Sequence, residues 1–141
     1  MPLMEKGVRA VADRMPKVIT PKVHTIIDYG VAAAFLAVAI KSLKSGSKKA
    51  GISAIIVAAS ELALIMMTDM PGGIARVVDL ETHLKIDYGI SGLVGSMPNA
   101  MGFSDEWQSW FFRSQGMSIA AVASLTSTRT AFDSRRARRA A

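Results

Sequence analysis

The sequence predicts an all-α membrane protein with four transmembrane helices, arranged as two repeated helical hairpins behind a basic amphipathic helix. Three observations predict this fold. Half of the 141 residues are hydrophobic and only 20% are charged, whereas soluble domains average about 25% charged residues. The charged residues cluster between long apolar stretches, and one motif occurs twice. Clustered charges are typical of membrane spans separated by loops.

The first 22 residues are expected to form the basic amphipathic segment. Apolar residues recur there at spacings of three and four among basic ones, which favours a helix lying on the membrane surface. A disordered basic tail is the alternative. The apolar positions are Leu3, Met4, Val8, Val11 and Met15.

Four stretches are long enough to cross a bilayer, namely residues 23–43, 51–68, 83–103 and 107–128. The first carries Asp28 near one end and Lys41 near the other, the second carries Glu61 in an apolar run, and the third is rich in glycine, serine and leucine. The fourth carries Arg113, whose side chain would have to reach the lipid headgroups. Its aromatic residues at the start favour a position at the membrane interface.

These spans are expected to pair into hairpins. The first hairpin repeat covers residues 23–70, the second covers residues 83–128, and a loop at 71–82 joins them. The basic tail at 129–141 is interpreted as a solvated stop signal. Residues 37–39 (AVA) have the form of a signal-peptide cleavage site, but cleavage there would remove half of the repeat, so we reject that interpretation.

Charge and composition restrict location and partners. Lysine and arginine concentrate in the N-terminal segment, the central loop and the tail, which predicts a multi-pass protein of the bacterial inner membrane with both termini cytoplasmic. The basic residues flank apolar segments, so membrane lipids rather than nucleic acid are the expected partners. The chain has no cysteine, which excludes a disulfide framework, a thiolate nucleophile and cysteine-ligated metal centres.

An internal repeat is the strongest signal. Residues 24–30 (HTIIDYG) recur as residues 83–89 (HLKIDYG), and each copy begins an odd-numbered span. Two intervening spans preserve the orientation, so the hairpins are expected to be parallel and related by an approximate twofold axis along the membrane normal. Both histidine–aspartate pairs would then lie near the cytoplasmic face.

The second copy carries a family resemblance. From residue 83 to residue 103 the pattern resembles the SPW-repeat family of bacterial membrane proteins, and residues 104–107 (SDEW) continue the likeness. The namesake Ser-Pro-Trp reads Met-Pro-Asn at residues 97–99. The resemblance implies a multi-pass membrane protein of two repeats and supplies no catalytic role. The matching residues are His83, Leu84, Asp87, Gly92, Pro98, Gly102 and Phe103.

The intramembrane polar residues are the candidate ligand-binding site. Histidine and aspartate four residues apart share one helix face, so each pair can form a hydrogen bond that fixes the imidazole tautomer. One interpretation is that each pair is a structural element at a helix start. The other is that the two pairs face each other and, with a buried acid, build a pocket for a proton, a metal or a small ligand. The candidates are His24, Asp28, Glu61, His83 and Asp87.

No cofactor follows from these residues alone. Two imidazoles with carboxylates suit zinc, iron or manganese, but the Glu-x-x-His motif of di-iron bundles is missing, so the sequence assigns no metal. Haem ligation by His24 and His83 is a further alternative. Glu61 should point into the bundle, either as a functional acid or as a neutral group hydrogen-bonded to Gln115 or a serine.

Two functional hypotheses remain. The first is a non-enzymatic structural or accessory subunit that packs in the bilayer against a membrane-protein partner or a second copy of itself. The alternative is a membrane protein that binds a small molecule, a proton or a metal through the five polar residues. An enzyme is less expected, because the chain has no recognisable nucleophile or phosphate-binding loop.

Overall fold

The computed structural model describes residues 6–7, 10 and 14–128. Four long helices make up this part of the chain: α2 (Pro21–Lys44), α3 (Lys48–Met67), α4 (Leu80–Met101) and α5 (Gln108–Leu125). Ten of the 22 residues of the predicted amphipathic segment, and the whole basic tail, lie outside the described residues. The all-α prediction is confirmed.

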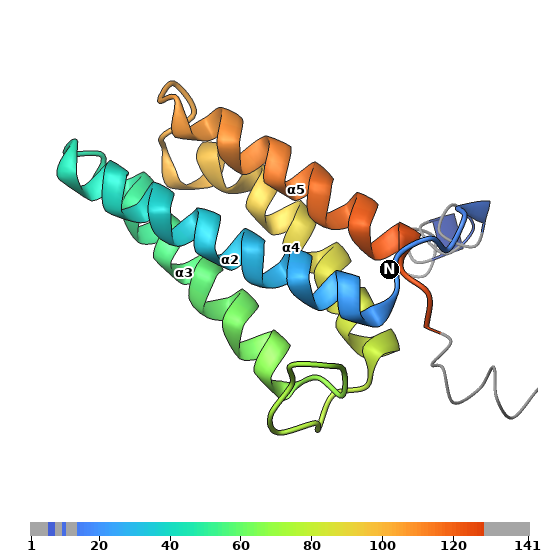
Figure 1. Ribbon diagram of the computed structural model, residues 1–141. Coiled ribbons are helices and arrows are strands. Elements are labelled where there is room, and N and C mark those ends of the chain that lie inside the picture. Colours follow the sequence, from blue (N-terminus) through green and yellow to red (C-terminus); the bar gives the residue numbers. More distant parts are fainter. Residues whose placement is uncertain (1–5, 8–9, 11–13, 129–141) are drawn as a thin grey trace, which may run out of the picture.

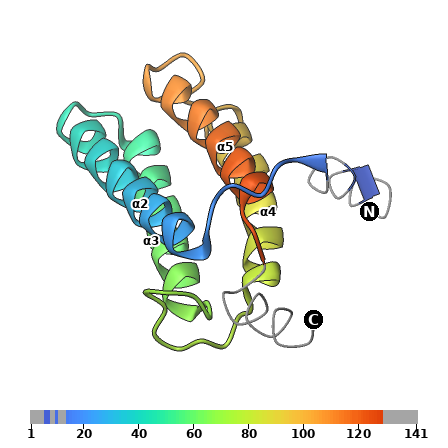
Figure 2. The ribbon, with the colours of Figure 1, turned by 45° about the vertical axis from the view of Figure 1, so that its right-hand side comes forward.

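The helices form two antiparallel hairpins that lie side by side (Figures 1 and 2). Helix α2 packs mainly against α3, and α4 packs mainly against α5, with fewer contacts from one hairpin to the other. The predicted pairing into two hairpins is therefore confirmed. The loop from α3 to α4 lies at one end of the bundle, and the turns within the hairpins lie at the opposite end (Figure 1).

The first helix of each hairpin begins at a side-chain cap. Thr20 precedes α2 and its hydroxyl accepts from the backbone N–H of Val23, while Pro21 occupies the first turn, where its missing N–H costs nothing. Asp79 precedes α4, and its carboxylate accepts from the backbone N–H of Thr82 at 2.9 Å. That hydrogen bond lowers the pKa of the Asp79 carboxyl. The caps fix where the two histidine-bearing turns start.

An aromatic cluster joins the hairpins toward the end that carries the hairpin turns. Phe35 of α2 makes edge-to-face contacts with Phe111 and Phe112 of α5, at ring-centroid distances of 4.9 and 5.2 Å. Phe103 stacks in the same way on Phe112 at 5.0 Å. These rings are part of the main hydrophobic core, together with small alanines of α2 and α3. Edge-to-face pairs add to the stabilisation from apolar burial.

Two of the helices, α2 and α3, are long and apolar enough to cross a bilayer. Core helices of soluble proteins share this property, so length and composition are weak indications by themselves. Helix α4 is more polar because Glu81, Lys85 and Asp87 lie in its first turns, and α5 carries Arg113. The Arg113 guanidinium donates to the Asn99 side chain of α4 at 3.0 Å.

Close packing of α4 on α5 depends on Gly116. A Cβ atom at this position would lie 2.6 Å from the backbone oxygen of Ser91 and 3.0 Å from the backbone nitrogen of Gly95. We expect Gly116→Ala to destabilise the fold by about 1–3 kcal/mol, because the helices must move apart. Thermal unfolding of the purified protein measures the effect. Gly92→Ala is the matched control, since nothing lies within 4 Å of its Cβ position; equal melting temperatures for the two variants would contradict this packing.

Candidate functional site

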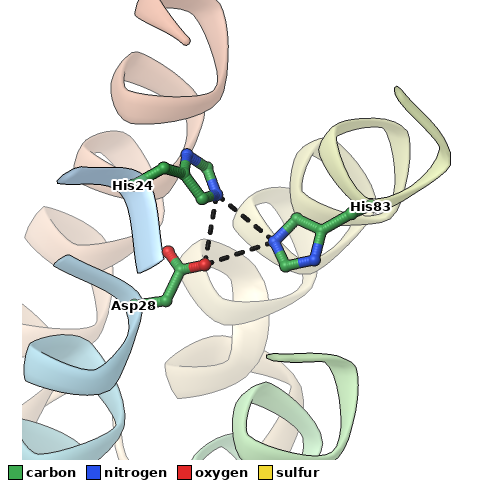
Figure 3. Close-up of side chains that lie close together, drawn as sticks. All are labelled: His24, Asp28 and His83. Atoms are coloured by element: carbon green, nitrogen blue, oxygen red, sulfur yellow. Dashed lines mark hydrogen bonds and ion pairs between the residues drawn. The ribbon is translucent and has the colours of Figure 1, made fainter. Parts of the chain in front are cut away.

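The two histidine–aspartate pairs meet between the hairpins. His24 and Asp28 come from the first two turns of α2, and His83 and Asp87 come from the first two turns of α4. The two imidazole Nε2 atoms lie 3.2 Å apart. Figure 3 shows His24, His83 and Asp28 pointing toward one another from the two helices.

Each carboxylate lies close to both imidazoles. Asp28 Oδ2 is 3.1 Å from Nε2 of His24 and 3.2 Å from Nε2 of His83. Asp87 Oδ2 is 3.3 Å from each of the same two nitrogen atoms. The near equality of these distances agrees with the approximate twofold axis that the repeat predicts. We call the four residues the His/Asp cluster.

The His/Asp cluster is almost closed to solvent. Both histidines are 0% exposed, and the aspartates are 7% and 2% exposed. A ligand larger than an ion or a water molecule would have to displace helices to reach the nitrogen atoms. The geometry therefore disfavours an organic small molecule, which the sequence left open.

Two threonines fix the orientation of the imidazoles. Thr126, which follows α5, contacts Nδ1 of His24 at 2.7 Å, and Thr68, which follows α3, contacts Nδ1 of His83 at the same distance. Each threonine hydroxyl donates its single proton to the carbonyl oxygen four residues earlier, at 2.6 Å. It can therefore only accept from the imidazole, so Nδ1 carries a proton in both rings.

The tautomer has a direct chemical consequence. A neutral imidazole with its proton on Nδ1 presents an unprotonated Nε2, which is the form that binds metals. Both Nε2 lone pairs then face the centre of the His/Asp cluster, where the two carboxylates also converge. His24, His83 and Asp28 place three electron-pair donors close together there, an arrangement that a cation would stabilise.

Two carboxylate oxygens of the His/Asp cluster lack hydrogen-bond donors. Asp28 Oδ2 is buried and accepts no hydrogen bond of good geometry, although both Nε2 atoms lie within ion-pair distance. Asp87 Oδ1 is also buried without a donor. Buried carboxylates without donors are costly unless a cation compensates them.

The distances among His24, His83 and Asp28 suit three ligands of one metal ion. A Zn²⁺ ion bound at about 2.0–2.1 Å places its ligand atoms about 3.3–3.4 Å apart. The five distances that join the imidazole nitrogens to each other and to the carboxylates lie between 3.1 and 3.3 Å. His24, His83 and Asp28 supply three atoms within 4.8 Å of one another, a group that does not include Asp87.

Haem ligation does not fit this arrangement. A haem iron held by two histidines needs a flat macrocycle between the rings. Here the Nε2 atoms of His24 and His83 are in contact at 3.2 Å, and carboxylates lie beside both. The interpretation of each pair as a separate structural element at a helix start does not describe the site. Each aspartate lies about as close to the histidine of the other hairpin as to the histidine of its own helix.

Glu61 lies in α3 near the His/Asp cluster but outside its direct contacts. It is 2% exposed. Its Oε1 atom is buried without a hydrogen-bond partner. Hydrogen bonding to Gln115 or a serine, which the sequence left open, is not found among the described residues.

Thr68 and Thr126 are the site residues that sequence reasoning missed. Each ends the second helix of a hairpin and serves the histidine of the other hairpin. The flanking segments cross in the same way, since Ile19 pairs with Thr126 and Thr68 pairs with Val78. Extending the repeat to the ends of the even-numbered spans aligns the two threonines only if one residue is skipped, since His24 and His83 are 59 residues apart and Thr68 and Thr126 are 58 apart.

Comparison with known proteins gives no further guide. No family model, no curated protein and no solved structure matches the chain. The resemblance to the SPW-repeat family stays a prediction. The function must be argued from the site.

The threonine contacts can be tested by removing the hydroxyl. We expect Thr68→Val to destabilise the protein by about 1–3 kcal/mol, because the Nδ1–H of His83 loses its acceptor in a buried place. Thr68→Ser should restore most of the stability. Thr25→Val is the control, since this hydroxyl bonds only to the backbone of its own helix. Thermal unfolding compares the variants, and equal losses for Thr25→Val and Thr68→Val would refute the assigned role.

Proposed function

We propose that this protein is a small integral membrane protein that binds a divalent transition-metal ion in the His/Asp cluster. The observation that carries the proposal is the convergence of two Nε2 atoms and two carboxylates in a buried place, with threonines holding Nδ1 in the protonated form. The sequence alone favoured a structural or accessory role. That role stays a prediction, and the geometry favours the ligand-binding alternative.

A divalent ion would satisfy both imidazoles and a carboxylate, whereas one proton on either Nε2 would satisfy only the 3.2 Å contact between the two rings. Two imidazolium rings would place two N–H groups face to face at 3.2 Å, with like charges on both rings. Each N–H should then point at a carboxylate, yet Asp28 Oδ2 accepts no hydrogen bond of good geometry. A single divalent cation would remove both problems, because it would bind both imidazoles and the Asp28 carboxylate at once.

The donor set indicates the class of metal. Two imidazole nitrogens with carboxylate oxygens suit Zn²⁺, Mn²⁺ or Fe²⁺. Nitrogen donors disfavour Ca²⁺ and Mg²⁺, which prefer oxygen ligands. The threonines act as outer partners that orient the ligands, as hydrogen-bond acceptors do for metal-bound histidines elsewhere.

The outer surface supports a place in the bilayer. Many large apolar side chains of the helices are exposed, and exposed apolar surface, where it is extensive, marks contact with lipid or another protein. The predicted orientation, with both termini cytoplasmic, puts the His/Asp cluster about one turn inside the cytoplasmic face. Exposed examples are Ile26, Leu36, Ile40, Ile52, Ile55, Ile56, Leu93 and Met117.

Metal binding is measured directly on the purified protein. After loading with Zn²⁺ and removal of free ion, elemental analysis should find bound zinc in the wild type and none in His24→Ala or His83→Ala, because each loses an inner ligand. Thr68→Val should keep the site but weaken it by about 10–100-fold in equilibrium dialysis.

The control for this experiment is Asp69→Asn. Asp69 is an exposed acid at the same end of the bundle and pairs with Arg76, so its loss should leave zinc binding unchanged. A folded wild type without zinc, or equal zinc in the wild type and both histidine variants, would refute the proposal.

The membrane topology can be determined by labelling single introduced cysteines, because the chain has no cysteine of its own. We expect Ser45→Cys and Asp105→Cys to react with a membrane-impermeant maleimide on intact bacterial cells, and Ala75→Cys to react only after the membrane is opened. This result requires all four helices to cross. Protection of both Asp105→Cys and Ala75→Cys would mean that only α2 and α3 span the bilayer.

A further inference from the structure

Four lysines gather at the end of the bundle that carries the hairpin turns, opposite the His/Asp cluster (Figure 1). Two of them lie in the last turn of α2, and the other two are the first two residues of α3. All four side chains are exposed, and none forms an ion pair with an acid in the part of the chain that the structure describes. We call Lys41, Lys44, Lys48 and Lys49 the lysine patch.

The lysine patch extends from the first hairpin to the turn of the second. The Lys41 ammonium lies 4.7 Å from the centre of the Trp107 ring, just before α5. The Nζ atom of Lys49 lies 3.2 Å from the Cβ position at Gly102, the residue that ends α4. Two charges of the first hairpin are therefore placed against the connection between α4 and α5, and both turns share one basic surface.

The acids at this end do not neutralise the lysine patch. Residues 41–49 contain four lysines and no acid, while residues 102–107 contain two acids, Asp105 and Glu106. The first turn of α3 contains no acidic residue, so the positive end of the helix dipole adds to the charge of Lys48 and Lys49. Such a concentration of positive charge attracts an anionic partner.

The aromatic residues beside the lysine patch indicate the kind of partner. The chain has two tryptophans, Trp107 and Trp110, and both lie at this end, 48% and 79% exposed. Tryptophan is enriched where the hydrocarbon core of a bilayer meets its headgroups, and lysines beside apolar segments attract anionic lipids. Leu43 and Ile52, which flank the lysines in the sequence, are exposed as well. A bilayer surface matches both the charge and the apolar side chains, whereas a nucleic acid matches the charge alone.

We propose that the lysine patch binds the phosphate groups of anionic phospholipids, with the two tryptophans at the headgroup level beside them. The inference rests on the part of the proposed function that places the bundle in a bilayer, and it does not depend on the metal ion. Lysine ammonium groups bind phosphate as point charges. Anionic lipids are therefore enriched around the end of the bundle that carries the hairpin turns.

The experiment uses Trp107 and Trp110 as reporters, since the chain has no other tryptophan. The full chain is reconstituted in vesicles of equal parts phosphatidylglycerol and phosphatidylcholine. One of the two lipids carries brominated acyl chains, which quench tryptophan fluorescence on contact, and exchanging the label between the lipids gives their relative binding. We expect phosphatidylglycerol to be preferred about fivefold or more, because each basic residue near an anionic surface strengthens binding by about that factor.

A triple variant removes most of the lysine patch but keeps the Lys41 contact with Trp107. Its preference for phosphatidylglycerol should fall to about twofold or less, because three of the four charges are gone. The substitutions are Lys44→Gln, Lys48→Gln and Lys49→Gln.

The matched control removes the same charge from exposed basic residues at the opposite end of the bundle. It should keep the wild-type preference, because these residues lie far from the tryptophans. A loss of preference in the control as well as in the triple variant overturns the assignment to the lysine patch. The control substitutions are Lys22→Gln, Arg76→Gln and Lys85→Gln.

The other outcomes separate this inference from the proposed function. Equal quenching by both lipids in the wild type, or a preference that survives in the triple variant, overturns the lysine patch, while zinc analysis of the same sample tests the metal site independently. Absence of quenching by either lipid overturns the placement in the bilayer. Should the triple variant fail to fold, about 0.5 M salt must weaken the wild-type preference by screening, and an unchanged preference overturns the inference.

Discussion

The arrangement of the bundle depends on the contact between two imidazoles from different hairpins. His24 and His83 touch at 3.2 Å, and each is held by a threonine and an aspartate of the opposite hairpin. Contacts between the hairpins are few elsewhere, apart from the phenylalanine cluster. Each polar contact in a low-dielectric place is strong when satisfied and costly when it is not. The residues that form the His/Asp cluster are therefore also residues that hold the two hairpins together.

Much of the fold could be predicted from the sequence. The long apolar stretches and the glycine-containing loops define four helices, and the duplicated HxxxDYG motif indicates two equivalent hairpins. The same motif predicted that His24, Asp28, His83 and Asp87 could face one another. Two copies with the same orientation present the same helix face to a common axis, which is why a local pattern carried information about a contact between distant residues.

The rest depends on tertiary contacts that no local pattern encodes. Thr68 and Thr126 are single threonines at helix ends, where this residue type is common for reasons unrelated to a site. The sequence placed Glu61 in the bundle interior but gave two readings of its role, because a hydrogen bond to another helix depends on how helices rotate about their axes. The unpartnered oxygens of Asp28 and Asp87 become visible only when every nearby donor is placed.

The crossed threonine contacts bear on how such a protein can arise. One hairpin alone contains a histidine, an aspartate and a threonine, yet its threonine reaches only the histidine of a neighbouring hairpin. A single-hairpin ancestor would thus complete the cluster only as a pair of identical chains. Once both copies are joined in one polypeptide, the two hairpins no longer need the same sequence. Seven residues before its threonine, α3 carries Glu61, whereas α5 carries Ile119 at the corresponding position. The acid that breaks the symmetry needs to be introduced only once.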